Sequence, residues 1–155
     1  MDNSELRAQL ADLHPLSFGW ALSCCRGDRI QADDVLQNAY MKILDGRARF
    51  GAKSTFKTWL FGLIRNTARE ERRRHLLRSA GLLRYQPPET APLDPERALS
   101  KKESCQRIQT ALRRLSPRQQ EVLHLVFYQD LTIEEAACVM TVSLGSARKH
   151  YQRGK

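Results

Sequence analysis

The feature that most constrains this chain is a proline-bearing segment over residues 82–95, LLRYQPPETAPLDP, which holds four of its six prolines. Proline fixes the backbone torsion φ and lacks an amide hydrogen, so this segment cannot continue a helix. On both sides of it the apolar residues recur at helical spacing, and no convincing strand pattern is present. The sequence therefore predicts an all-α fold of two small helical domains, residues 1–81 and 96–155, joined by a proline-rich linker over 82–95.

The N-terminal block carries three helical patterns. Residues 13–25 are apolar on most sides, which predicts a largely buried helix. Residues 32–44 carry a two-residue-wide apolar stripe, with Asp33 and Asp34 at the helix N-terminus, where the helix dipole favours negative charge. A third helix, capped near Ser54, carries apolar residues with 3.6-residue periodicity, namely Phe56, Trp59, Leu60, Leu63, Ile64, Thr67 and Ala68.

Arginines take over where the apolar face of the third helix fades. A charge run of this kind is often only a solvated helix end, and Glu70 and Glu71 are expected to pair with some of the arginines. The alternative is that the helix leaves the bundle and contacts an anionic partner. The arginines concerned are Arg65, Arg69, Arg72, Arg73, Arg74 and Arg78.

The C-terminal block begins with two further helical patterns. Residues 96–115 carry apolar residues on one side, which predicts an amphipathic helix. A second helix is expected from Pro117 to about Tyr128. Ser116 is its N-cap, and Gln119 completes a capping box. In a capping box the side chain of each of the two residues accepts a hydrogen bond from the backbone amide of the other.

Residues 131–155 predict two short helices joined by a tight turn. Thr132 and Glu135 form another capping box, and Ser143 is a good N-cap for the last helix. In a DNA-reading helix-turn-helix, the second helix enters the major groove. An ordinary helical hairpin with a solvated basic end is the alternative. The last helix offers donors for phosphates and base edges from Arg148, Lys149, His150, Gln152 and Arg153.

The overall charge bears on the kind of partner. A net charge of +9 favours a polyanion over an acidic substrate or a neutral protein surface, without deciding between nucleic acid and an anionic membrane. No apolar run approaches the ~20 residues that a bilayer span requires, and residues 1–14 lack the pattern of a signal peptide. We therefore expect no membrane insertion and a cytoplasmic location.

Catalytic and metal-binding motifs are not found in the sequence. The four cysteines lack paired CxxC spacing and neighbouring histidines, so a metal site is not expected. Cys24 and Cys25 are interpreted as small buried hydrophobes, the alternative being a strained vicinal disulfide. Without a glycine-rich phosphate loop or a nucleophile paired with a base, we expect no enzymatic activity, no cofactor and no small-molecule substrate.

Three stretches together resemble a known family. They are DDVLQNAYMKI (33–43), STFKTWLFGLIRN (54–66) with the arginines after it, and ALRRLSPRQQEVLHLVFYQDLTIEEAACVMTVSLGSARK (111–149). In this order, and separated by a proline-bearing linker, they resemble the extracytoplasmic-function (ECF) sigma factors, small bacterial subunits that direct RNA polymerase to promoters. The resemblance implies a region 2-like bundle of three or four helices in 1–81 and a region 4-like helix-turn-helix domain in 96–155.

The resemblance also implies partners and site residues. The partners are core RNA polymerase and promoter DNA, and an anti-sigma factor is compatible with the family. Core polymerase would be contacted by Asp34, Gln37 and Asn38. The minus-ten element would be recognised and melted by a pocket loop with Arg47, Phe50 and Lys53 and by a helix face with Arg65, Asn66, Arg69 and Arg73. The minus-thirty-five element would be read by Ser143, Ser146, Arg148, Lys149 and Arg153.

The sequence departs from the family pattern in the helix-turn-helix. Thr141 stands at the turn position usually held by glycine, so a left-handed backbone there would be strained, or the turn would have another shape. Ala147 and Tyr151 stand where larger aliphatic residues usually pack, which bears on how the recognition helix is seated.

Two other functions are compatible with parts of the pattern. One is a stand-alone helix-turn-helix regulator that binds palindromic operators as a dimer. The other is an interaction or adaptor protein without DNA specificity, whose basic face docks an acidic partner. The arginine-bearing helix of the first block favours the sigma factor, because neither alternative requires it.

Overall fold

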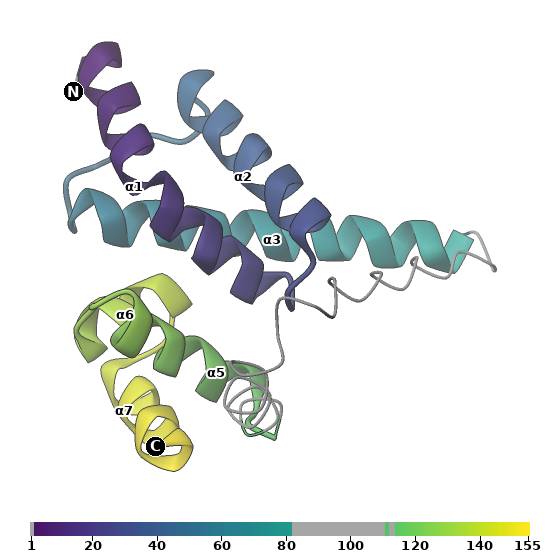
Figure 1. Ribbon diagram of the computed structural model, residues 1–155, viewed down its shortest axis with the longest axis vertical. Helices are drawn as coiled ribbons and strands as arrows, with labels where there is room; N and C mark the ends of the chain where they lie inside the picture. The colour runs from purple at the N-terminus through teal and green to yellow at the C-terminus, as the bar shows by residue number, and fades with distance from the viewer. Residues whose placement is uncertain (1, 82–110, 112–113) are drawn as a thin grey trace, which may run out of the picture.

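The computed structural model describes residues 2–81, 111 and 114–155. Every regular element within these residues is a helix, which confirms the predicted all-α fold. The predicted linker over 82–95 and most of the predicted helix over 96–115 lie outside the described residues. Figure 1 shows the elements, which are α1 (Asn3–Cys24), α2 (Arg29–Leu44), α3 (Phe56–Gly81), α5 (Pro117–Leu123), the π-helix η2 (His124–Tyr128), α6 (Ile133–Met140) and α7 (Leu144–Gly154).

The N-terminal half consists of α1, α2 and α3, each of which packs against the other two. Trp20 of α1 is fully buried and donates a hydrogen bond from Nε1 to the Phe61 carbonyl of α3 at 3.0 Å. The two rings stack with their centroids 6.2 Å apart. Burial of these aromatic rings makes a large hydrophobic contribution to the fold. Other members of this core are Val35, Leu36, Ala39, Leu60 and Ile64.

The first helix differs from its prediction in length and burial. It begins at Asn3, ten residues before the predicted start. Asp2 is its N-cap, and the Asp2 amide donates a hydrogen bond to the Glu5 carboxylate at 3.4 Å. The prediction of a largely buried helix was wrong, because Leu16 is 39% exposed and the buried side chains form only one face. Those buried side chains are Leu10, Ser17, Trp20 and Ala21.

Helix α2 begins earlier than predicted, whereas α3 begins where it was predicted. α2 starts one turn early because the Asp28 carboxylate accepts hydrogen bonds from two amides of the first turn, at 3.0 and 3.2 Å. Asp33 and Asp34 consequently lie beyond the first turn, so their predicted position at the helix N-terminus was wrong. Helix α3 is capped near Ser54 as predicted, by Thr55, whose Oγ1 accepts a hydrogen bond from the Thr58 amide at 3.2 Å.

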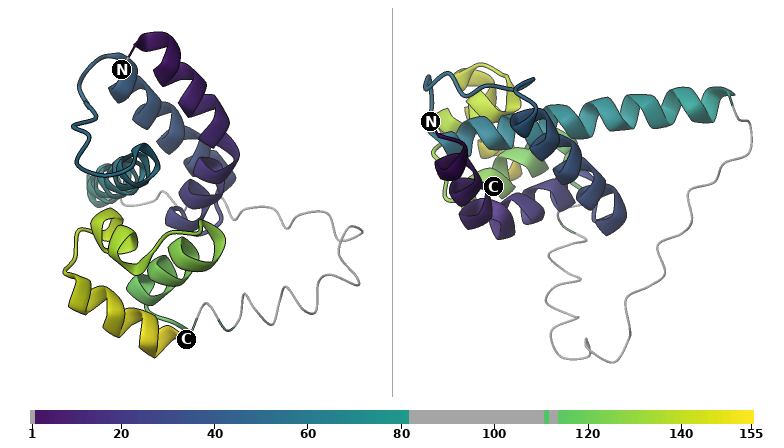
Figure 2. Two further views of the ribbon diagram at one scale, coloured as in Figure 1. Left: turned by 90° about the vertical axis from the view of Figure 1, so that its left-hand side faces the viewer. Right: turned by 90° about the horizontal axis from the view of Figure 1, so that it is seen from above.

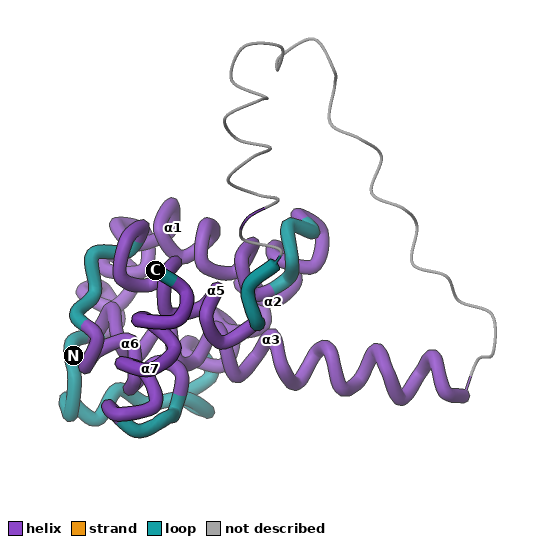
Figure 3. Tube along the Cα trace, turned by 90° about the horizontal axis from the view of Figure 1, so that it is seen from below, coloured by secondary structure: helices purple, strands orange, loops and turns teal. Residues whose placement is uncertain are grey.

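Helix α3 has a buried first half and an exposed second half. It contains 26 residues, which corresponds to roughly 39 Å at 1.5 Å per residue. Figure 3 and the right-hand view of Figure 2 show its C-terminal part projecting from the body. From Arg72 to Arg78 all side chains are exposed. The apolar periodicity predicted this loss of burial along the helix.

The C-terminal half consists of α5, η2, α6 and α7. The predicted capping box at the start of α5 is confirmed, with the Gln119 amide donating to Ser116 Oγ at 3.3 Å and the Ser116 amide to Gln119 Oε1 at 3.2 Å. The helix predicted to continue to Tyr128 changes at His124 into the π-helix η2. This half lies against the N-terminal half, α6 packing on α3 and η2 on α1 (Figure 1).

Candidate nucleic-acid interface

The helices α6 and α7 form the predicted helix-turn-helix. The Glu135 amide donates to Thr132 Oγ1 at 3.1 Å, and the Thr132 amide donates to the Glu135 carboxylate at 2.9 Å. Residues 141–143 make the turn. Ser143 Oγ then caps α7 by accepting a hydrogen bond from the Ser146 amide at 3.2 Å. Both predicted caps are confirmed, and they fix where α7 begins.

Thr141 ends α6 in the left-handed conformation, with φ 52° and ψ 44°. This conformation brings the β-carbon of an L-residue too close to its own carbonyl oxygen. Thr141 Oγ1 donates to the Met140 carbonyl at 2.7 Å, and the Val142 amide donates to the Ala137 carbonyl at 3.1 Å. The turn therefore keeps the shape that favours glycine, and the strain expected from the sequence is present.

Replacing Thr141 with glycine is expected to stabilise the protein by about 1 kcal/mol, because the steric cost of the left-handed conformation is removed. Urea denaturation followed by circular dichroism measures the effect. The neighbouring Val142→Gly variant is the control, since Val142 does not have a positive φ and its partly buried side chain would be lost. Val142→Gly is expected to destabilise, and a Thr141→Gly variant that also destabilises would contradict the strain argument.

Helix α7 has one packed face and one basic face. Ala147 is fully buried, and the half-buried Tyr151 stacks on Phe127 with ring centroids 6.0 Å apart. Ala147 and Tyr151 therefore pack α7 against the rest of the C-terminal half, although larger aliphatic residues are usual at these positions in the family. The predicted contact residues Arg148, Lys149 and Arg153 are all exposed on the other side. Ser143 and Ser146 lie at the N-terminus of α7, where Ser143 Oγ donates to Ser146 Oγ at 3.0 Å.

The loop between α2 and α3 carries the three residues predicted to form a base pocket. Arg47 and Lys53 are exposed, and Arg47 pairs with Asp45 at 2.9 Å. Phe50 is half-buried, with its ring centroid 5.5 Å from those of Phe56 and Trp59. Phe50 thus anchors the loop to α3 and leaves the two cations at the surface.

Helix α3 presents a row of exposed polar residues from its middle toward its C-terminus. Asn66, Arg69 and Arg73 are exposed and recur at i, i+3 and i+7, which places them on one face of the helix. Arg65, predicted to belong to the same set, differs from them. Its side chain is only 5% exposed, and its Nε donates to the Glu121 carboxylate of α5 at 2.8 Å. Sequence reasoning missed Glu121, because its proximity to Arg65 depends on how the two halves pack.

The carboxylates of α3 pair mainly with α2, which the sequence did not indicate. Glu70 pairs with Lys42 at 2.6 Å, so its predicted pairing with an arginine was wrong. Glu71 accepts a hydrogen bond from Asn38 Nδ2 at 2.6 Å and lies 3.8 Å from Arg74. These contacts join the outer edge of α2 to α3.

Helix α2 carries the predicted polymerase contacts. Asp34 and Gln37 are exposed, whereas Asn38 is half-buried because its side chain bonds Glu71 of α3, so it is less open to a partner than the other two. Met41 is 53% exposed and continues the Asp34–Gln37 row at i+7. Leu44, predicted in the apolar stripe, is 49% exposed. Met41 and Leu44 therefore make the exposed face of α2 more apolar than the sequence indicated.

The cysteines adjoin the junction of the two halves. Burial is the main cause that raises the pKa of the Cys25 thiol to about 11 and that of Cys24 well above its ordinary value, with Glu121 raising the latter further. Both groups therefore stay protonated at neutral pH, and a thiol is a weak nucleophile compared with a thiolate. Cys25 is buried and Cys24 half-buried, and both are free, which agrees with a packing role.

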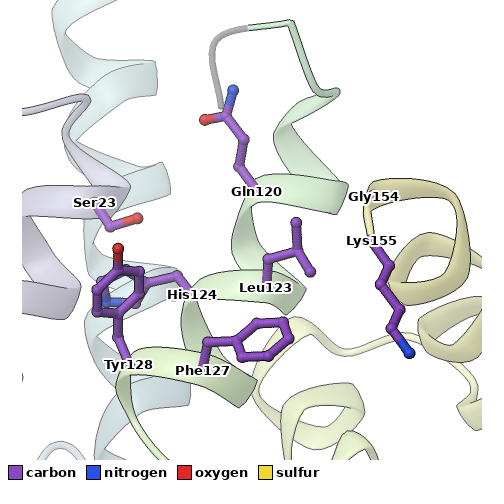
Figure 4. Close-up of a pocket in the computed structure, with 8 residues that line it drawn as sticks. All are labelled: Ser23, Gln120, Leu123, His124, Phe127, Tyr128, Gly154 and Lys155. Atoms are coloured by element: carbon purple, nitrogen blue, oxygen red, sulfur yellow. The ribbon is translucent and has the colours of Figure 1, made fainter. Parts of the chain in front are cut away.

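A groove of about 350 Å³ lies where α1, α5, η2 and α7 meet. Figure 4 shows the Tyr128 ring in front of His124 with its hydroxyl directed toward Ser23, while Phe127 and Lys155 lie on the side nearer α7. In the described part of the chain, no three His, Cys, Asp or Glu side chains are grouped so that they could hold a metal ion. None of the described helices is both long and apolar enough for a membrane span.

Comparisons with known families cover both halves. Residues 10–77 match the family Sigma-70 region 2, and residues 105–155 match Sigma-70, region 4. The chain is similar to the RNA polymerase sigma factor YlaC of Bacillus subtilis (strain 168), at 28% identity over 80% of this chain and 73% of that protein. It is also similar to the ECF RNA polymerase sigma factor EcfG of Rhodopseudomonas palustris (strain TIE-1), at 28% identity over 83% and 70%.

Solved structures show the same fold. The sigma factor RpoE in complex with the anti-sigma factor NepR from Bartonella quintana superposes with a TM-score of 0.68, at 24% identity over 97% of this chain and 91% of that one. CnrH in complex with the cytosolic domain of CnrY gives a TM-score of 0.65, at 20% identity over 98% and 84%.

The two family matches occur in the order of the two helical halves, and the curated relatives are sigma factors over most of the chain. The basic face of α7 and the polar row of α3 lie within the two matched regions. The matches favour neither a stand-alone regulator nor an adaptor. The chain therefore belongs to the extracytoplasmic-function sigma factors of the sigma-70 family, non-enzymatic subunits that bind core RNA polymerase and direct it to specific promoters.

Proposed function

We propose that promoter contact is divided between the two halves of the chain. In this division residues 1–81 bind core polymerase and open the minus-ten element, residues 82–95 are a linker, and residues 96–155 read the minus-thirty-five element. The observation that carries the proposal is the pair of polar surfaces on α7 and α3. The face of α7 opposite its cations is packed, and so is the part of α3 that carries Asn66 and Arg69, whereas Arg73 lies on the exposed extension of α3.

The basic face of α7 suits duplex DNA. Arg148, Lys149 and Arg153 donate from a helix whose other side is fixed by Ala147, so the face is presented as a unit. Arginine and lysine bind phosphates and the guanine edge in the major groove. Ser143 and Ser146 add hydroxyls at the helix N-terminus, where the positive end of the dipole favours a phosphate.

The row on α3 and the loop before it suit a separated DNA strand. Asn66, Arg69 and Arg73 form a polar track, and Arg47 and Lys53 add cations beside the aromatic cluster. Single strands are held by positive grooves, and an extruded base needs a pocket close by. We assign the track to the backbone of the melted strand and the loop to the base.

The exposed row on α2 is the proposed polymerase contact. Asp34 and Gln37 are assigned to it, with Met41 adding apolar surface. Asn38 belongs to the contact only if it exchanges Glu71 for a polymerase group on binding. A mixed row of this kind, with an apolar residue among polar ones, is typical of protein–protein interfaces.

The site of action follows from the partner. Core RNA polymerase and the bacterial chromosome lie in the cytoplasm, so we place the protein there. RpoE, one of the similar solved structures, is complexed with an anti-sigma factor, and we propose that this chain also has one. Co-purification from the native host would test whether polymerase subunits and an inhibitor accompany the chain.

Arg148→Ala or Lys149→Ala is expected to weaken binding of the holoenzyme to upstream duplex by about 1–3 kcal/mol, because each removes a phosphate or base contact. Asn66→Ala is expected to leave upstream binding unchanged and to reduce formation of the open complex. Upstream footprinting and permanganate footprinting of unpaired thymines measure the two effects separately, and run-off transcription from a selected promoter measures their combined result.

Arg118→Ala is the charge-matched control, because Arg118 is an exposed arginine in the first turn of α5 and outside α7. It is expected to leave both footprints unchanged. Identical defects in Arg148→Ala and Asn66→Ala would contradict the division of labour. Failure of the wild-type chain with core polymerase to give any specific transcript would contradict the proposed function as a whole.

A further inference from the structure

The polar track of α3, made of Asn66, Arg69 and Arg73, has a carboxylate as a direct neighbour. Glu70 lies four residues after Asn66 and three before Arg73, and side chains at these spacings are neighbours on a helix surface. We propose that Lys42 of α2 is a positioning residue that holds the Glu70 carboxylate away from the track, so that the track meets DNA with its full positive charge. The inference rests on the proposed function, since it takes the track to bind the separated strand.

Two contacts fix the Lys42 ammonium group against α3. It donates to Glu70 Oε2 at 2.6 Å and to Thr67 Oγ1 at 3.3 Å. Thr67 is 1% exposed, and its hydroxyl donates in turn to the Leu63 carbonyl at 2.8 Å, which leaves its oxygen free to accept from Lys42. The Lys42 side chain is itself only 21% exposed. The ammonium group is therefore held at one place beside α3.

The bridge determines the side of α3 on which the Glu70 carboxylate lies. Helices α2 and α3 pack against each other (Figure 1), and Lys42 draws the carboxylate toward α2. The Glu70 side chain is 54% exposed, so burial does not hold it there. Arg73 and Arg74 follow it by three and four residues, which is the spacing of helical ion pairs. Without Lys42 we expect the carboxylate to turn toward these arginines.

The second carboxylate of α3 does not threaten the track in the same way. Glu71 accepts a hydrogen bond from Asn38 Nδ2 at 2.6 Å, and its helix neighbours at three and four residues lie outside the track. Arg69 and Arg73 have no ion-pair partner in the part of the chain that the structure describes. The two cations of the track are thus available to a phosphate while Lys42 engages Glu70.

The charge of the track bears directly on its affinity for a single strand. The logarithm of the binding constant falls with the logarithm of the salt concentration, with a slope of about −0.7 for each phosphate that the protein neutralises. An unpaired Glu70 beside Arg73 would cancel one positive charge, so one phosphate contact would be lost. At about 0.1 M salt this loss corresponds to about fivefold weaker binding, and the slope becomes less steep by about 0.7.

Binding of the holoenzyme to a fork-junction DNA tests the role of Lys42. The DNA comes from the promoter selected by run-off transcription, with one strand of the minus-ten element left unpaired, and binding is titrated over a range of salt concentrations. Lys42→Met keeps most of the aliphatic stem and removes the ammonium group. It is expected to bind about fivefold more weakly at about 0.1 M salt, with the shallower slope. Lys42→Arg keeps the pair with Glu70 and should bind like wild type.

A second substitution distinguishes positioning from a purely structural role. In the double variant Lys42→Met with Glu70→Gln no unpaired carboxylate lies beside the track, so the affinity and the salt slope should return to the wild-type values. A lysine that only tied α2 to α3 would not be rescued, because the double variant also lacks the bridge. A lysine that itself contacted DNA would leave the double variant as weak as Lys42→Met.

Arg29→Met is the matched control, because Arg29 is an exposed cation near the other end of α2. It should leave the affinity and the slope unchanged. The exchanged pair Lys42→Glu with Glu70→Lys rebuilds the bridge with the cation next to the track and should bind at least as tightly as wild type, which keeps the test valid if Lys42→Met does not fold. Circular dichroism and gel filtration with core polymerase establish that each variant is folded and assembled.

The positioning role of Lys42 is overturned if Lys42→Met binds the fork as tightly and with the same slope as wild type, or if Glu70→Gln does not restore binding. Arg73→Ala tests the proposed function separately, because it removes a cation of the track directly. An Arg73→Ala variant that binds like wild type would mean that the track does not hold the strand. If Arg73→Ala weakens binding and Lys42→Met does not, the proposed function stands and only the role of Lys42 fails.

Discussion

Replacing Trp20 with alanine is expected to destabilise the protein by about 3–5 kcal/mol, the range for removing a buried aromatic side chain. Trp20 is fully buried and fills the space between α1, α3 and η2. Its indole also donates to the Phe61 carbonyl at 3.0 Å, and alanine offers no replacement donor. With typical stabilities of about 5–15 kcal/mol, a loss of this size is a large fraction of the total free energy of unfolding.

Urea denaturation monitored by circular dichroism measures the change in unfolding free energy. The matched control is Tyr128→Ala, which removes an aromatic ring that is 61% exposed and is expected to cost less than about 1 kcal/mol. Trp20→Phe keeps a buried aromatic ring but loses the indole donor and part of the ring volume, so it is expected to destabilise less than Trp20→Ala. A Trp20→Ala variant as stable as Tyr128→Ala would show that α1 is not part of the common core.

The parts of the fold that follow from local chemistry were predictable from the sequence. The capping boxes at Ser116 and Thr132 and the cap at Ser143 depend on residues three positions apart, and all three are confirmed. The family resemblance pointed to Thr141 as the turn position usually held by glycine and left two outcomes open, a strained left-handed backbone or another turn shape, and the structure has the first. The helical class was predictable from apolar periodicity, and the division into two helical blocks was predicted from the prolines of residues 82–95.

The start and course of several helices were not predictable in this way. Residues 3–12 contain several polar side chains, yet they extend α1 because Leu6, Leu10 and Leu13 face the core. The π-helix at His124 carries apolar residues whose spacing also fits an α-helix, so sequence periodicity does not distinguish the two. Helix α2 begins earlier than expected because the Asp28 carboxylate accepts hydrogen bonds from two amides of the first turn.

The candidate site was only partly predictable for a related reason. Exposure of Arg148, Lys149, Asn66 and Arg69 follows from their position on amphipathic helices. The burial of Arg65 does not, since it depends on a carboxylate 56 residues away in the chain. Contacts between the halves leave no periodic trace in the sequence, which is why the pairing of Arg65 with Glu121 became visible only in the structure.

Acidification is expected to weaken the protein through His124, which lies at the same junction. Burial against Trp20, Tyr128 and Gln129 lowers the pKa of His124 from about 6.5 to about 4. The 3.1 Å contact between His124 Nε2 and Gln129 Nε2 also favours the neutral ring. The Gln129 amide nitrogen donates to an unprotonated His124 Nε2, whereas protonation of Nε2 would place two donors against each other. The folded state therefore binds this proton more weakly than the unfolded state does.

The pH range of the effect follows from the two pKa values. Above about pH 6.5 His124 is neutral in both states and the stability is complete, whereas between 6.5 and 4 only the unfolded state takes up the proton. Stability is thus lost as the pH falls, by up to about 3 kcal/mol at 1.36 kcal/mol per pKa unit. Other groups also titrate in this range, so the quantity to measure is the difference between wild type and His124→Gln.

Urea denaturation of wild type and His124→Gln at pH 7.5, 6, 5 and 4.5 isolates this contribution. Glutamine keeps a hydrogen-bonding amide near Gln129 but cannot titrate, and the carboxylates contribute equally to both proteins. Wild type should lose stability relative to the variant progressively below pH 6.5. Parallel curves for the two proteins, or a wild type that gains on the variant in acid, would mean that His124 is hydrated and that the junction around Trp20 is open in solution.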